Sequence, residues 1–416
     1  MQDTPWYSTN PGTLADAVNR LFSAGYTPHW GTFASTKWYN EHSEDHKVTE
    51  SLSLEYIHNV LHNVTGGVSY KEGMGHMSDV LVAAFDPIFW LHHCNIDRLT
   101  AMWQALHWES WFDTQEPTDV SQENVPDKKE DDPLQPFHTK ANGDPGKDVW
   151  TSRMTRDWTK LSYSYDTLEP SKEVLDSSGA LDEDKYKDAL RAKVNELYPS
   201  TGQFVNRVFQ SRKIKTPNGV DAVEGEEEHK KLDRWNDFLI NVVYDRYALG
   251  GTSYSIVFYL GGNKNDPYTV CSSKCLVGRI YTFSAGSQTA TDGGCANCTA
   301  QQKAGVLSRA QIPVTIKLLQ DVLDQERDVW SMESEKVQTY LEDNLHWKFV
   351  AYGGEELKAS KFPNTQIKVY CGHGKPEEAS VPEKNGMDLP LMQHFDKEYR
   401  LLYTPLEGKL GASETA

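Results

Sequence analysis

The hydrophobic pattern of this chain changes its period between the first and the second half. Apolar residues recur at helical spacing in residues 13–25, 51–67 and 86–108, which predicts amphipathic helices. Beyond residue 235 the pattern alternates, and residues 252–262 and 276–285 are rich in β-branched and aromatic side chains. The sequence therefore predicts an α+β protein, in which a helical core is followed by a mostly-β, sandwich-like C-terminal domain.

A polar segment with turn residues and a run of charges separates these two parts. We expect residues 1–214 to form the helical core, residues 215–234 an exposed linker, and residues 235–416 the β-rich domain with one helix at 314–324. Residues 113–148 are acidic and rich in Pro and Gly, and they predict a long irregular loop. A chain of 416 residues is long enough for two such domains.

The charge balance excludes several classes of partner. The net charge of −18 argues against a nucleic-acid surface, which needs clustered Lys and Arg, and against an anionic membrane. No run approaches the roughly 20 apolar residues of a membrane-spanning helix. The first residues lack the pattern of a signal peptide, so the sequence predicts a cytoplasmic, intracellular protein. The six cysteines form no dense disulfide framework.

Histidines stand out in two of the predicted helices. His58 and His62 are four residues apart, so they project from one helical face and can share a metal ion. The pair His42 and His46 has the same spacing but no apolar stripe beside it, which favours a solvated face. A pair of histidines at this spacing also occurs by chance. A zinc hydrolase is disfavoured, because it would need a Glu between His58 and His62, and residues 59–61 are Asn-Val-Leu.

A third imidazole comes from the helix predicted at residues 86–108. Asp86 suits its N-cap and Pro87 its first position, and the adjacent His92 and His93 stand in an apolar run. Three imidazoles suit copper or zinc. Asp97 follows His93 by four residues, so we expect its carboxylate to lie behind the ring and orient it.

The segments that carry these histidines resemble a known family. "EYIHNVLHN", "GHM" and "AAFDPIFWLHHCNIDRL" resemble the copper-B half of the tyrosinase family of dicopper proteins. "YALGGTSYSIVFYLG", "VGRIYTFSA" and "CANCTAQQKAGVLSRAQIPVT" are similar to the C-terminal domain of fungal tyrosinases. The resemblance implies a latent copper oxidoreductase that uses O2 to hydroxylate monophenols and to oxidise o-diphenols to quinones in pigment (melanin) formation.

The resemblance also implies roles for individual residues. Matched position by position, the copper ligands are His58, His62 and His93; the supporting neighbour is His92; the acid that holds an active-site water is Glu55; the amide that helps to deprotonate a phenol is Asn59; and the gate above the copper is Val80.

Further expectations concern the C-terminal domain, which covers the copper site in fungal proenzymes. Phe283 matches the aromatic placeholder that enters the site, although Phe283 and Tyr281 both suit a strand core. Cys295 and Cys298 match a copper-delivery pair, with a structural disulfide as the alternative. Cys271 and Cys275 form an incidental pair or a disulfide. The linker at 215–234 is the expected cutting site of an activating protease.

One element of the family pattern is missing from the sequence. Each copper of the family is held by three histidines, but only His29, His42 and His46 precede His58, and none stands in a copper-A context. The family is expected to bind two copper ions, but only one three-histidine site is evident in this sequence. We expect that the copper-A half is absent by truncation or by divergence. The alternative is a non-catalytic, haemocyanin-like copper- or oxygen-binding protein. The sequence predicts no oligomeric state.

Overall fold

The computed structural model describes most of the chain. The described residues are 13–23, 25–37, 48–67, 75–112, 129–144, 146–210, 234–261, 275–285, 296–323, 332–377, 392–396 and 398–405. The first part is mainly helical, as predicted. Its helices are α2 (Thr13–Phe22), α3 (Trp30–Ala34), α4 (Leu54–Gly66), α5 (Pro87–Leu106), α6 (Ser152–Thr155), α7 (Glu183–Leu197) and α8 (Thr201–Gln210), with short 3-10 turns that include η1 (Val48–Ser51), η2 (His76–Ser78) and η3 (Ala83–Phe85).

The second part is built on two antiparallel sheets. One has the strand order β10-β9-β3-β6 with β11 also paired to β9, and the other has the order β5-β4-β7-β8. The strands are β3 (Trp235–Tyr244), β4 (Tyr254–Leu260), β5 (Leu276–Tyr281), β6 (Ser308–Pro313), β7 (Leu345–Ala351), β8 (Glu356–Leu357), β9 (Gln366–Glu377), β10 (Met392–Phe395) and β11 (Arg400–Tyr403). The α+β class and the β-rich second part are thus confirmed.

The two long helices that carry the histidines begin and end where the sequence predicts. Asp86 Oδ1 accepts a hydrogen bond from the Ile88 amide (3.1 Å), and Pro87 opens α5. The Ser53 hydroxyl accepts from the Tyr56 amide at the start of α4 (3.3 Å). The helix α4 ends at Gly67, whose φ of +70° is readily adopted only by glycine. Local chemistry therefore determines both helix boundaries.

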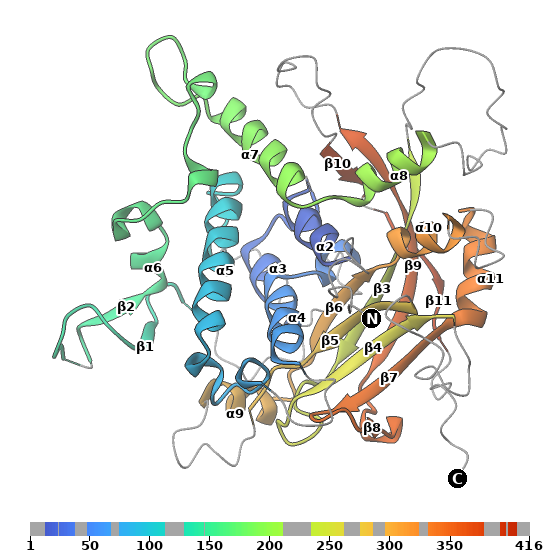
Figure 1. Cartoon of the computed structure of the whole chain (residues 1–416). Coiled ribbons are helices and arrows are strands. Elements are labelled where there is room, and N and C mark those ends of the chain that lie inside the picture. Colours follow the sequence, from blue (N-terminus) through green and yellow to red (C-terminus); the bar gives the residue numbers. More distant parts are fainter. Residues whose placement is uncertain are drawn as a thin grey trace.

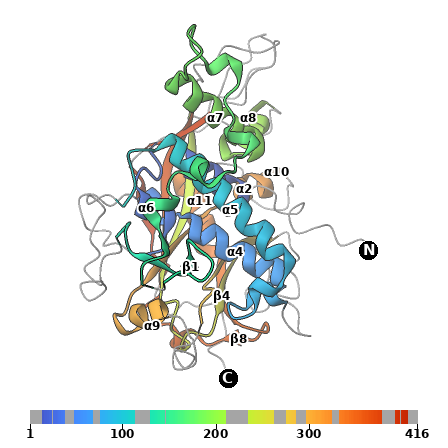
Figure 2. The same cartoon turned by 90° about the vertical axis from the view of Figure 1, so that its left-hand side faces the viewer.

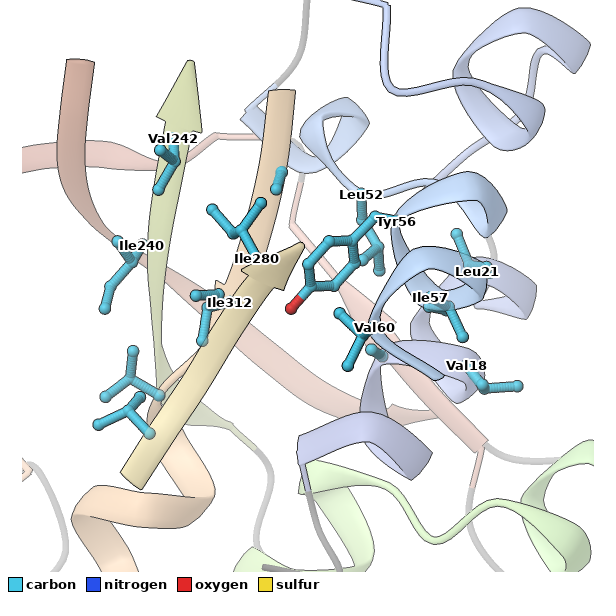
Figure 3. Close-up of a cluster of buried hydrophobic side chains, with 14 of the residues drawn as sticks. Val18, Leu21, Leu52, Tyr56, Ile57, Val60, Ile240, Val242, Ile280 and Ile312 are labelled. Carbon is cyan, nitrogen blue, oxygen red and sulfur yellow. The ribbon is translucent and has the colours of Figure 1, made fainter. Parts of the chain in front are cut away.

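The helical part and the β-rich part share one hydrophobic core. Figure 3 shows Tyr56, Ile57 and Val60 of α4, with Val18 and Leu21 of α2 behind them, facing the strands. Ile280 of β5 and Ile312 of β6 lie on the strand side of the same cluster. The two sheets also touch, because a Cβ placed on Gly278 would come within 2.8 Å of Ile312. The two parts thus contribute to one continuous hydrophobic cluster.

A buried charge cluster joins the two parts at a second place. Arg20 of α2 is fully buried and contacts two carboxylates: Asp16 of the same helix (2.6 Å) and Asp237 of β3 (2.7 Å). Thr201 donates its amide to Asp16, and Tyr399 donates its hydroxyl to Asp237 (2.8 Å). Buried charges persist only when they are paired and hydrogen-bonded, so this cluster fixes α2 against the sheet.

Several elements differ from the sequence prediction. The segment 113–148, predicted as an irregular loop, contains β1 (Pro133–His138), which pairs with β2 (Val149–Thr151) just after it. This hairpin lies on the opposite side of α5 from the sheets (Figure 1). The predicted helix at 314–324 is α10 (Thr315–Leu323), and two unpredicted helices accompany it, α9 (Ala296–Lys303) and α11 (Ser334–Asn344). Their polar faces are exposed, so periodicity gave only a weak signal.

α7 and α8 lie toward one end of the molecule and α9 and β8 toward the other, with α4 and α5 between them (Figure 2). All but the last residue of the predicted linker 215–234 lies outside the described residues. In the part of the chain that the structure describes, no helix is long and apolar enough to cross a bilayer.

Candidate metal centre

Three histidine side chains from two helices converge on one point. His58 and His62 project from α4, and His93 projects from the first half of α5. The Nε2 atom of His58 lies 3.0 Å from Nε2 of His62 and 3.1 Å from Nε2 of His93. These separations fit nitrogens that each lie about 2 Å from a common ion. Among the described residues, these three histidines are the His, Cys, Asp or Glu side chains that lie close enough to one another to hold a metal ion.

The opposite nitrogen of each ring is held by an oxygen. Nδ1 of His62 lies 2.7 Å from the Met77 carbonyl, and Nδ1 of His93 lies 2.8 Å from the Phe89 carbonyl. Nδ1 of His58 lies 2.9 Å from Asn59 Oδ1. Carbonyl oxygens only accept hydrogen bonds, so each Nδ1 carries the proton and each Nε2 presents its lone pair. Three lone pairs that face one another repel unless a cation lies between them.

The protonation of the rings agrees with a ligand role. Burial, followed by the neighbouring His58, lowers the pKa of His62 to about 3. Burial also lowers the pKa of His58. Neutral imidazole is the form that binds a metal, and a neutral donor set of three nitrogens suits copper or zinc. The residues present therefore fit the copper ion that the sequence resemblance implies.

His92 lies beside the three converging rings but points elsewhere. Its ring stacks on the His58 ring at 5.0 Å between centroids and 22° between planes. It forms a hydrogen bond with the His58 backbone, while its buried Nε2 has no partner among the described residues. Burial lowers the pKa of His92 to about 3. The structure thus places His92 against a ring of the trio, outside the point of convergence.

The prediction for Asp97 is wrong. Its carboxylate accepts hydrogen bonds from the hydroxyls of Tyr163 (2.8 Å) and Tyr165 (2.6 Å), and the His93 ring is oriented by the Phe89 carbonyl instead. Side chains on a helix lean toward its N-terminus, so the His93 ring approaches the preceding turn rather than the following one. Spacing by four residues made an Asp97–His93 pair possible, but the two tyrosines engage the carboxylate and the Phe89 carbonyl already holds Nδ1 of His93.

Glu55 is bound by groups from outside its helix. Arg246, in the turn after β3, forms an ion pair with Glu55 Oε1 (2.6 Å). The other oxygen, Oε2, accepts from the Thr36 amide (2.7 Å) and the Thr36 hydroxyl (3.0 Å). Burial by itself raises the pKa of Glu55, but Arg246 and Thr36 outweigh burial and lower the pKa to about 2. One turn later, Asn59 has a buried Nδ2 without a partner among the described residues.

Phe283 of the β-rich part covers the trio. Its ring stacks on the His62 ring, with 3.9 Å between centroids and 21° between planes, and it meets the His58 ring edge-on at 5.6 Å. Tyr281, the neighbouring aromatic, instead donates its hydroxyl to the Ser78 carbonyl. The backbone of Phe283 has a φ of +41°, which is uncommon for a non-glycine residue. The structure thus brings Phe283, rather than Tyr281, to the histidines.

Val80 and Cys298 are among the described residues, whereas Cys295 is not. Val80 lies in the turn after η2 and is 36% exposed. Cys298 lies on α9 and is hydrogen-bonded to Tyr247, whereas Cys295 lies outside the described residues. Cys275 is disulfide-bonded, which agrees with the second of its two predicted alternatives, an incidental pair or a disulfide. The roles of Val80 and of the cysteine pair remain predictions.

Of the three histidines that precede His58 in the sequence, the structure describes only His29, which does not join the trio. His29 caps α3 and lies in electrostatic reach of His107, at the far end of α5 from His93. His42 and His46 lie outside the described residues. The structure of the described part therefore contains one three-histidine cluster.

The sequence missed four contributors to this site. The Met77 and Phe89 carbonyls leave no side-chain signal. Arg246 is 191 residues from Glu55 along the chain, so no local pattern connects them. In the sequence, Gly66 is only one of the last residues of the helical pattern 51–67, but a Cβ there would lie 2.4 Å from the Ser78 amide nitrogen. Gly66 thus admits the segment that carries the Met77 carbonyl.

Comparison with known proteins agrees with this arrangement. Residues 2–106 match the family model described as the common central domain of tyrosinase, and residues 237–369 match the tyrosinase C-terminal domain. Over 388 residues the chain is 37% identical to a tyrosinase of Aspergillus fumigatus, which covers 87% of this chain and 52% of that protein. A tyrosinase of Neurospora crassa is 27% identical over 440 residues, covering 86% of this chain and 59% of that protein.

A solved structure gives the same result for the fold. The holo-protyrosinase of Aspergillus oryzae superposes with a TM-score of 0.57 at 26% identity, covering 97% of this chain and 54% of that chain. The fold and the site define a helical metal-binding core covered by an antiparallel β-domain. The chain belongs to the tyrosinase family and is similar to its fungal members. It spans about half the length of the curated relatives it matches.

Proposed function

We propose that this chain provides the histidine-bound copper centre, and its cover, of a tyrosinase-type oxidoreductase that acts on phenols with O2. The observation that carries the proposal is the convergence of three Nε2 lone pairs, each fixed by a hydrogen bond at Nδ1. Copper bound by His58, His62 and His93 would supply the chemistry that activates O2. We further propose the family role in pigment formation.

The residues around the trio would handle the phenolic proton. Asn59 fixes the His58 ring through Oδ1 and keeps a buried N–H group free to bind a substrate oxygen or a water. Glu55, one helical turn earlier, is the carboxylate in reach of His58, whose pKa it affects. A carboxylate and an amide that hold one water between them would orient it toward a phenol hydroxyl. Val80 would limit access from the turn after η2.

We propose that the chain as described is a latent form. Phe283 occupies the face of His62 on which an aromatic substrate would stack. Opening the site then requires that the covering part move or be removed, and a protease that cuts within residues 215–234 would release it. Cys295 and Cys298 would deliver Cu(I) to the trio, since thiolates prefer that ion.

Copper content and O2 uptake test this function. The full chain should bind one copper through the trio, and the variant His93→Ala should lose it. After limited proteolysis, O2 uptake with a catechol would support the oxidase, whereas copper binding without uptake would favour the haemocyanin-like alternative. Retention of all copper by a His58→Ala/His93→Ala chain would contradict the proposal. The same metal analysis measures whether a second ion binds.

A further inference from the structure

The turn after β3 and the end of β5 reach the metal centre together. Ser284 donates its hydroxyl to the carbonyls of Arg246 (3.1 Å) and Gly251 (2.9 Å). The Ser284 amide donates to the Ser253 hydroxyl (2.9 Å), which in turn donates to the Ser284 carbonyl (3.0 Å). The residue next to Phe283 is therefore hydrogen-bonded to the turn that carries Arg246, so Phe283 and Arg246 are held as one unit.

This unit contacts the metal centre at two points. Phe283 stacks on the His62 ring, and Arg246 forms an ion pair with Glu55. Both oxygens of Glu55 are engaged, Oε1 by Arg246 and Oε2 by Thr36, so a water or a phenol must compete with these donors for the carboxylate. Arg246 also donates to the Thr36 hydroxyl (2.6 Å), which closes the cluster around the carboxylate.

We propose that Arg246 is a second inhibitory contact of the β-rich part, which withholds the Glu55 carboxylate from the reaction while Phe283 blocks the trio. This inference rests on the proposed function, in which Glu55 helps to remove the phenolic proton. Departure of the covering part removes both contacts at once. Removal of the ring alone leaves Glu55 bound to Arg246.

Electrostatics gives the contact its effect. A carboxylate whose pKa is about 2 accepts a proton poorly near neutral pH. Without the guanidinium, burial would raise the pKa of Glu55 and make the carboxylate a stronger base. Arg246 therefore acts through Glu55, as a positioning residue, and a Lys at this position would keep the charge.

The first test measures the ionisation of Glu55 in the full chain without metal. Carboxyl-labelled ¹³C-Glu protein gives one signal that disappears in Glu55→Gln, and that signal reports the charge of Glu55. At pH 5 we expect an ionised Glu55 in the wild type and in Arg246→Lys, and at least a tenfold rise in its protonated-to-ionised ratio in Arg246→Met. An unchanged Glu55 signal in Arg246→Met would overturn the proposal. The circular dichroism spectrum of each variant confirms folding.

The second test follows a phenolic probe. Zinc is redox-silent, so the zinc-loaded chain binds 4-nitrophenol without turnover, and absorbance reports whether the probe is ionised. In Phe283→Ala we expect the bound probe to remain a phenol at a pH below its own pKa. In Phe283→Ala/Arg246→Met its O–H proton should pass to Glu55, which raises the ratio of phenolate to phenol about tenfold.

Two further variants decide the second test. Adding Glu55→Gln should abolish the gain in phenolate, and Phe283→Ala/Arg246→Lys should show no gain. Equal ionisation of the probe with and without Arg246 would overturn the inference. A failure of the proposed function would give a different result: zinc binding would not depend on His93. The carboxyl signal of Glu55 is measured without metal, so it tests the inference about Arg246 separately.

Discussion

The Phe283 ring lies 3.9 Å from the His62 ring and nearly parallel to it, although 221 residues separate the two in the chain. A residue with a φ of +41° supplies this contact. Strained backbone at a functional site persists only when the surrounding structure imposes it. Here the hydrogen bonds of Ser284 hold the backbone next to the strained residue.

The strain at Phe283 predicts an unusual order of stability. Both Phe283→Ala and Phe283→Gly lose the stack on His62, but only glycine tolerates the positive φ without strain. We expect Phe283→Gly to be more stable than Phe283→Ala by about 1 kcal/mol in the free energy of unfolding, measured with urea. At Phe137, an exposed strand residue, the alanine variant should be the more stable one. The same order at both positions would contradict the strain.

The trio predicts a graded loss of metal affinity. Alanine at His58, His62 or His93 removes a nitrogen from the point of convergence and should abolish tight binding of Cu(II), measured by competition with a chelator. His92→Ala removes the ring that stacks on His58, and should reduce affinity by about 10- to 100-fold. His138, exposed on β1, provides the matched control and should leave affinity unchanged. Equal losses for His92 and His138 would exclude a supporting role.

The close contact at Gly66 predicts that a residue outside the trio affects the copper affinity of the three histidines. A methyl group at this position would lie 2.4 Å from the Ser78 amide nitrogen, so η2 must move and carry the Met77 carbonyl with it. We expect Gly66→Ala to lower the free energy of unfolding by about 1–3 kcal/mol and copper affinity by about tenfold. Gly146→Ala meets only Asp144 Oδ1 at 3.4 Å and should change neither quantity.

The buried Arg20 predicts a large loss of stability. Arg20→Met leaves the carboxylates of Asp16 and Asp237 buried without their cation, which should cost about 3–5 kcal/mol of the free energy of unfolding. Arg153→Met removes exposed ion pairs with Asp131 and Glu130 and should cost far less, because water screens charges at the surface. Urea denaturation of both variants measures the difference. Similar losses would show that burial of the Arg20 cluster does not decide its contribution.

The pKa of Glu55 predicts how stability depends on pH. Because this pKa is lowered from 4.5 to about 2, the folded state holds the charged form more strongly than the unfolded chain does. The stabilisation is fully present above pH 4.5 and is lost as the pH falls toward 2. The stability difference between the wild type and Glu55→Gln should therefore shrink below pH 4.5. A difference that grows on acidification would reverse the sign and refute the ion pair with Arg246.

Local patterns in the sequence were enough to predict the two helices that carry the histidines, whereas the choice of His93 over His92 came from the family resemblance. Helical spacing placed His58 and His62 on one face, and the Asp86-Pro87 start fixed the helix that carries His93, because both depend on neighbours within a few residues. The same local reasoning failed for Asp97, because Tyr163 and Tyr165, which lie more than 60 residues further along the chain, take up its carboxylate.

The sequence by itself thus determined the α+β class, the two histidine-bearing helices and the metal type that three imidazoles favour. Only the tertiary structure decided what covers and orients them: Phe283 on His62, Arg246 on Glu55, and the Met77 carbonyl admitted by Gly66. These contacts join segments far apart in the chain, so they depend on how the two sheets and α4 pack around a shared core. Packing of that kind follows from the whole fold and leaves no periodic signal in any one segment.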